Sequence, residues 1–129
     1  MRAYTVATTA VTLDMPRKWV DNTLSHFDVP GVRQSRQGVS RKLSPRAVLI
    51  LAIGLRLVKA LGVPMNIALP LAAQLAEPGV AEPRIEIAGG IWLEMDVASV
   101  ARDIEARLAQ AVELTPIPRR GRPPGKTVK

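Results

Sequence analysis

The sequence predicts a mainly α fold in which one short basic hairpin and one later hairpin separate groups of helices. Three observations predict it. Apolar residues recur at spacings of three and four over most of the 129 residues. The N-cap types Thr5, Ser44 and Asp96 stand directly before such patterns. Strand-like alternation is clearest in 84–87 and 91–95.

The first two helices are short and joined by a tight connection. Thr5 caps a helix over 6–13, and Asp14 is expected to cap a second helix that holds Pro16 in its first turn and runs to about His26. One face of the first helix carries Val6, Ala10 and Leu13. Two helices connected in this way are typical of DNA-binding heads, in which one helix presents its outer face.

The second helix has separate inward and outward faces. Spacing turns inward Trp19, Val20, Thr23, Leu24 and Phe27. Arg17, Lys18, Asp21 and Asn22 remain on the solvent side. Arg and Lys bind guanine edges or phosphates and Asn pairs with adenine, so these four residues are the candidate edge for reading DNA.

The segment 29–43 predicts a basic hairpin, or wing. A turn signal at Pro30-Gly31 is followed by four cations, with no acid among them. They are Arg33, Arg36, Arg41 and Lys42. Such cations repel one another unless an anion lies opposite, which favours phosphate contacts. A solvated surface loop is the alternative.

Two further helices should follow the wing. Ser44 and Pro45 begin a helix that ends near Leu61 and is apolar nearly all round, but its apolar run is too short to cross a membrane. A fourth helix is expected over 65–76, with Pro70 either kinking it or marking its start. Its expected inward residues are Ile67, Leu71 and Leu75.

A hairpin and a last helix complete the ordered part. A three-residue loop would place Ile87 opposite Ile91, Ile85 opposite Leu93 and Arg84 opposite Glu94, with one face of the hairpin buried. Asp96 then caps a helix over 97–114, whose apolar stripe is Val97, Val100, Ala101, Ile104, Leu108, Ala111 and Val112. That helix either pairs with its copy in a dimer or covers the hairpin of its own chain.

Charge is distributed unevenly along the chain. The net charge is +7 over residues 1–59, −5 over 60–115 and +5 over 116–129. A nucleic acid is the simplest partner for the basic ends, and a protein partner suits the acidic part. There is no cysteine, His26 is the only histidine, and no carboxylate pair stands out, so we expect no metal, no cofactor and no enzyme activity. No signal peptide is visible, which makes a cytoplasmic, nucleoid-associated protein the default.

The last residues form a basic tail rich in Pro and Gly, expected to be disordered when free. Its centre is Arg119, Arg120, Gly121 and Arg122. The Arg-Gly-Arg core resembles the AT-hook, which occupies the minor groove of A·T-rich duplex DNA. A basic tail that only aids solubility is the alternative.

The order of helix, helix, wing and long helix resembles the winged helix-turn-helix head of MerR-type transcriptional regulators. The match is best at Tyr4-Thr5-Val6, at Val39-Ser40-Arg41-Lys42-Leu43-Ser44 and at Leu61-Gly62. The resemblance implies that Pro16-Arg17 begins the recognition helix and that Arg41 contacts the DNA backbone. The chain has Val20-Asp21-Asn22 where the family usually has Arg-Tyr-Tyr.

These observations predict three parts: a DNA-binding head at 1–77, a hairpin and helix at 78–115 as a dimerisation element, and the tail at 116–129. We expect a homodimeric transcriptional regulator that binds duplex DNA. We expect it not to bind a membrane. Two other functions fit the pattern: a phage or mobile-element DNA-bending protein of excisionase type, and an antitoxin or adaptor that binds a protein partner through residues 60–115.

Overall fold

The computed structural model describes residues 3–34, 41–79 and 83–114. The described chain is mainly helical with two small antiparallel sheets, as the sequence predicts. Its elements are β1 (Tyr4–Thr5), α1 (Val6–Leu13), α2 (Arg17–His26), β2 (Val32–Arg33), β3 (Lys42–Leu43), α3 (Pro45–Leu61), α4 (Met65–Leu75), β4 (Arg84–Ala88), β5 (Ile91–Glu94) and α5 (Val97–Leu114).

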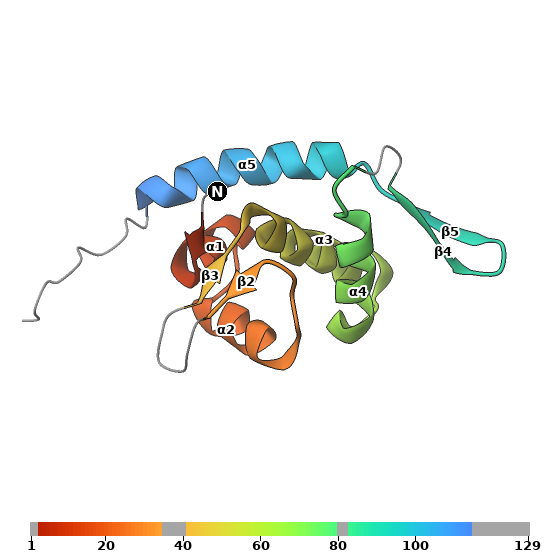
Figure 1. Cartoon of the computed structure of the whole chain (residues 1–129), viewed down its shortest axis with the longest axis horizontal. Coiled ribbons are helices and arrows are strands. Elements are labelled where there is room, and N and C mark those ends of the chain that lie inside the picture. The colour runs from red at the N-terminus through yellow and green to blue at the C-terminus, as the bar shows by residue number, and fades with distance from the viewer. Residues whose placement is uncertain (1–2, 35–40, 80–82, 115–129) are drawn as a thin grey trace, which may run out of the picture.

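The helices pack around α3. Helix α5 lies across α1 and α3, while α4 packs on α3 and α2 packs on α1 (Figure 1). The β4–β5 hairpin stands out from this body, on the side of α4 (Figure 1). None of the helices in the described ranges is long and apolar enough to span a bilayer.

Helix α1 is capped at both ends by residues that flank it. Thr5 Oγ1 accepts a hydrogen bond of 3.1 Å from the Thr8 N–H, as expected of an N-cap. The expectation that Asp14 caps α2 is wrong: Asp14 ends α1 in the left-handed conformation, with φ +55°. An Asp in this conformation is tolerated because its short polar side chain fits there.

Three threonines of α1 are buried, which the apolar spacing did not predict. Thr8, Thr9 and Thr12 are at most 3% exposed. The hydroxyls of Thr9 and Thr12 donate to the carbonyls of Thr5 and Thr8, each at 2.9 Å. Threonine hydroxyls can bond the carbonyl four residues earlier, so these side chains are buried without an unsatisfied donor.

Helix α3 has the predicted bounds. Ser44 Oγ accepts from the Ala47 N–H at 3.1 Å, and Gly62 ends the helix at φ +71°. Its interior residues form the centre of the core, including Val48, Ile50, Leu51 and Ile53, each at most 1% exposed. The same buried cluster takes residues from α1, α2, α4 and α5. It therefore contains residues from both the predicted head, 1–77, and the predicted hairpin and helix, 78–115.

The predicted inward face of α4 is partly wrong. Leu75 is buried, but Ile67 is 47% exposed, and the buried positions are Ala68, Leu69, Ala72 and Leu75. Small residues decide the face, since a Cβ added to Gly54 of α3 would lie 3.0 Å from Leu69 Cδ2. Pro70 lies inside the helix rather than at its start.

The first sheet has the strand order β1-β3-β2. Leu43 of the central strand is fully buried, opposite Tyr4 and Val32. Lys42 lies opposite Thr5 on one side and Arg33 on the other. Because side chains alternate along a strand, Lys42 and Arg33 share the face that points away from the core.

The β4–β5 hairpin keeps part of the predicted register. Arg84 lies opposite Glu94 and Ile85 opposite Leu93, as expected. Ile91 lies opposite Ala88, not Ile87, because the ladder is irregular between positions 86 and 88 and Gly89-Gly90 form the turn. The expected buried face is also wrong beyond Ile85 and Leu93, because Ile87 is 46% exposed and Ile91 is 55% exposed.

Helix α5 begins as predicted, with Asp96 Oδ1 accepting from the Ser99 N–H at 3.1 Å. The stripe residues Val100, Ile104, Leu108 and Ala111 are buried. They pack on the head, since α5 lies against α1 and α3. The stripe therefore packs on α1 and α3 of its own chain, and not on the hairpin, which was one of the two roles expected of it.

Candidate nucleic-acid interface

The first turn of α2 presents two exposed cations. Arg17 and Lys18 are the first two residues of the helix, and both are exposed. The N-cap residue is Pro16, so no side chain accepts from the first-turn amides. Free amides and the helix dipole favour an anion at such a helix start.

One turn further on, Asp21 and Asn22 occupy the same edge of α2. Asn22 is exposed, and its main-chain carbonyl oxygen lies 2.7 Å from His26 Nδ1. Asp21 is half-buried. Residues spaced by three or four share a helix face, so Asp21 lies on the edge that carries Arg17 and Lys18.

Strands β2 and β3 place two further cations side by side. Arg33 and Lys42 are direct partners in the antiparallel register, and both side chains are exposed. Within the described ranges neither forms an ion pair: the salt bridges found there involve Arg41, Arg46, Arg56 and Arg107. Like charges directly opposite in a sheet destabilise it, unless an anion neutralises them.

Arg41 joins these two groups of cations. Its guanidinium lies 3.6 Å from Asp21 Oδ1 and donates a hydrogen bond of 3.1 Å to Ser25 Oγ. Arg41 directly precedes β3, so the contact fixes the base of the wing strands against the exposed edge of α2. Only 24% of the Arg41 side chain is exposed.

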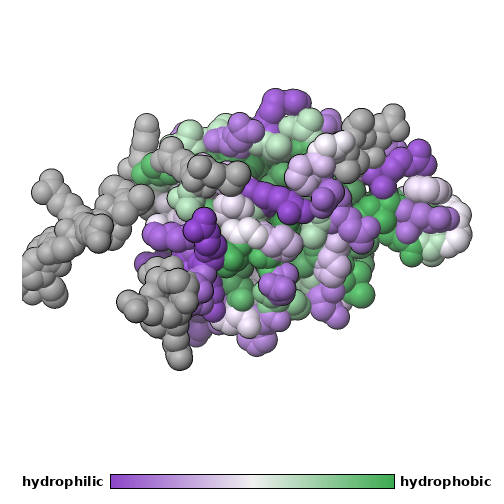
Figure 2. Space-filling model, viewed as in Figure 1, coloured by the Kyte–Doolittle hydropathy of each residue, from purple (hydrophilic) through white to green (hydrophobic). Residues whose placement is uncertain are grey.

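The joined elements form one hydrophilic end of the molecule. Figure 2 shows hydrophilic side chains gathered at the lower left, where Figure 1 places α2 and the first sheet. A hollow of about 330 Å³ lies between the end of α2 and the strands, lined in part by Ser25, Gln34 and Arg41. Arg41 thus brings the base of β3 beside the α2 edge, at the end of the molecule that also carries Arg33 and Lys42.

Several predicted site residues lie outside the described residues, namely Arg36, Arg119, Arg120, Gly121 and Arg122. The sequence reasoning missed Ser25, which holds Arg41 beside Asp21. The spacing of four between Asp21 and Ser25 is the signal that could have shown it, because it places both on one helix edge.

In the described part of the chain, no group of three or more His, Asp or Glu side chains could hold a metal ion. No protein-family model, curated protein or solved structure matches this chain.

Proposed function

We propose that this protein is a transcriptional regulator that binds duplex DNA through a winged helix-turn-helix head. In this proposal α2 enters the major groove, with Arg17, Lys18 and Asn22 facing base edges. Arg33, Lys42 and Arg36 contact phosphates, and the arginines of 119–122 occupy an adjoining A·T-rich minor groove.

One observation carries the proposal. Arg41 ties β3 to α2, so the unneutralised pair Arg33 and Lys42 belongs to the same end of the molecule as the exposed edge of α2. Separated cations would be compatible with a generic solvated surface. Cations gathered from two elements, one of them a strand pair with like charges opposed, favour an extended anionic ligand.

Asp21 and Arg41 have a different part in this proposal from the one the sequence suggested. The two charges face each other at the protein surface, at 3.6 Å. Asp21 restrains the wing, and Arg41 reaches a phosphate through donors that this contact leaves free. The remaining edge residues of α2 carry the base contacts.

The proposal includes a homodimer formed through the β4–β5 hairpin. The stripe of α5 is buried within the chain, whereas Ile87, Ile91 and Trp92 are about half exposed on the hairpin. The face with Trp92 also carries Arg84, Glu86 and Glu94, by the register of the strands. A two-fold copy can place unlike charges of this face against each other, as a self-complementary interface requires.

The salt dependence of DNA affinity tests the proposal. A labelled duplex is titrated by fluorescence anisotropy between about 50 and 200 mM salt, with Lys42→Gln and Arg33→Gln compared with Arg102→Gln, an exposed arginine on α5. We expect each of the two strand variants to weaken binding to all sequences and to lower the salt slope by about one. Equal behaviour of the three variants would refute the interface.

A further inference from the structure

A second hollow lies on another part of the molecule, between α1, α3 and α5. Its volume is about 510 Å³, within the range of small-molecule sites. Leu13 and Met15 from the end of α1 and the turn after it, Leu55 and Val58 from α3, and Ile104 from α5 supply its apolar lining. The proposed DNA contacts use none of these residues.

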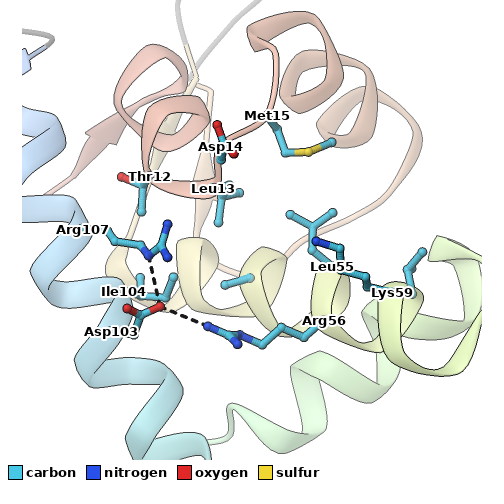
Figure 3. A pocket seen from close by; sticks show the side chains of 12 residues that line it. Thr12, Leu13, Asp14, Met15, Leu55, Arg56, Lys59, Asp103, Ile104 and Arg107 are labelled. Atoms are coloured by element: carbon cyan, nitrogen blue, oxygen red, sulfur yellow. Dashed lines mark hydrogen bonds and ion pairs between the residues drawn. The ribbon is translucent and has the colours of Figure 1, made fainter.

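The charged residues around this hollow give it a preference for one sign of ligand. Arg56, Lys59 and Arg107 line it together with only two carboxylates, Asp14 and Asp103. Figure 3 shows Arg56 of α3 and Arg107 of α5 converging on Asp103. Arg56 Nη2 and Arg107 Nε both lie 3.1 Å from the same oxygen, Asp103 Oδ2. Two guanidinium groups thus share one carboxylate, and an excess positive charge remains.

The donors for an anion come from α3. Arg56 and Lys59 are three residues apart on α3, so they lie on one side of that helix. Lys59 forms no ion pair among the described residues, and the guanidinium of Arg56 keeps donors beyond the one used by Asp103. Met15 and Asp14 stand on the opposite side of the hollow, near the turn between α1 and α2 (Figure 3).

We propose that this hollow binds a small carboxylate with an apolar body. The carboxylate lies at Lys59, whose ammonium group donates to it, and Arg56 remains bound to Asp103. The apolar body lies over Leu13, Met15 and Leu55. Asp14 repels a second negative charge, so a monoanion fits better than a dianion.

A ligand in this position touches the turn that connects α1 to α2. Asp14 and Met15 form that turn, and the Met15 N–H donates to the Ala10 carbonyl at 3.0 Å. Filling the hollow therefore acts on the segment that sets the position of α2. An effect on DNA affinity rests on the proposed function, whereas binding of the ligand does not.

Methyl NMR of the whole chain tests the site in the absence of DNA. With ¹³C-methyl methionine, titration with octanoate should shift the Met15 signal saturably and leave Met65 and Met95 unchanged, since neither lines the hollow. A parallel titration with 1-naphthoate distinguishes an aliphatic from an aromatic body, and saturation by either supports the site. The neutral 1-octanol should bind more weakly than octanoate.

Two variants of exposed cations test the role of Lys59, one at the hollow and one, as the control, away from it. Lys59→Gln should raise the dissociation constant of octanoate about fivefold, the upper range for one exposed charge, and Arg102→Gln should leave it unchanged. Absence of saturation at Met15 with both acids, equal shifts at Met15, Met65 and Met95, or equal affinity for octanol and octanoate would overturn the proposal. None of these results affects the proposed DNA interface, which the salt titration tests separately.

Discussion

The guanidinium of Arg41 lies 3.6 Å from the carboxylate of Asp21, across the gap between β3 and α2. This pair links β3, which carries the proposed phosphate contacts, to α2, which carries the proposed base contacts. Half of the Asp21 side chain is exposed, so solvent screens the pair and its contribution to stability is small. The pair holds the wing strands in position beside α2. In the proposed complex, a phosphate replaces Asp21 as the partner of Arg41.

Removing Asp21 should therefore strengthen DNA binding. Asp21→Asn eliminates a negative charge from the interface and releases Arg41 for a phosphate, so we expect several-fold higher affinity at low salt. Arg41→Gln should have the opposite effect. Anisotropy titrations measure both, with Glu105→Gln on α5 as the control for the loss of one acid. A weaker complex for Asp21→Asn would show that restraint of the wing matters more than the charge.

The opposed cations of the first sheet should cost the free protein stability. Lys42→Gln removes the repulsion with Arg33, and we expect the free energy of unfolding to rise by about 0.5 kcal/mol. Urea denaturation measures this change, with Arg102→Gln, which neutralises an exposed cation on α5, as the control that should stay unchanged. A gain in stability on neutralisation is expected of a residue that is kept for ligand binding although it destabilises the free protein. Equal or lower stability of Lys42→Gln would contradict the assigned repulsion.

Gly31 is required by the contact between the wing and α3. Its φ is +92°, and a Cβ there would overlap Ser44 Oγ, the cap of α3. Gly31→Ala should lower the free energy of unfolding by about 3 kcal/mol, from backbone strain and overpacking together. Gly62→Ala is the matched control, because it shares the positive φ but has open space around it. Strain alone should cost about 1 kcal/mol there.

The elements of the fold could be predicted from local signals. Ser44 before Pro45, and Thr5 and Asp96 before apolar runs, define helix starts that the structure confirms. Asp14 shows the limit of such signals, because the same residue type suits an N-cap and a left-handed helix end. Which role it takes depends on how α1 and α2 pack, and that is not a local property.

Burial was harder to predict where small or polar residues decide it. The face of α4 follows Ala68 and Ala72, which allow a close approach to α3, rather than the larger Ile67. The apolar stripe of α5 was predicted correctly, but the spacing of apolar residues does not show which surface a helix packs on. In the structure the stripe packs on α1 and α3. In the candidate interface, the cations were visible in the sequence, namely Arg17, Lys18, Arg33, Arg41 and Lys42. The contact that aligns Arg41 with Asp21 required the fold.

The tail should add affinity only for A·T-rich sites. Narrow A·T minor grooves concentrate negative potential, and Arg120 and Arg122 flank a glycine that allows a close approach. Arg120→Ala should weaken binding to an A·T-flanked duplex several-fold and have little effect on a G·C-flanked one. Lys126→Ala removes a tail charge outside the Arg-Gly-Arg core and serves as the control. Equal losses of affinity on both duplexes, or equal losses for both variants, would show that the tail contributes only nonspecific positive charge.

The hairpin should control the oligomeric state. Trp92 is 52% exposed and stacks under the guanidinium of Arg84, whose carbon lies 4.4 Å from the ring centroid. Trp92→Ser removes the largest apolar surface of the hairpin, so light scattering after size exclusion should show a dimer converted to a monomer. Ile67→Ser is the matched control, because Ile67 is similarly exposed on α4, and it should leave the dimer intact. A dimer that survives Trp92→Ser would place the interface elsewhere. A monomeric parent protein that copurifies with a different chain, and loses it in Trp92→Ser, would instead assign the hairpin to a protein partner.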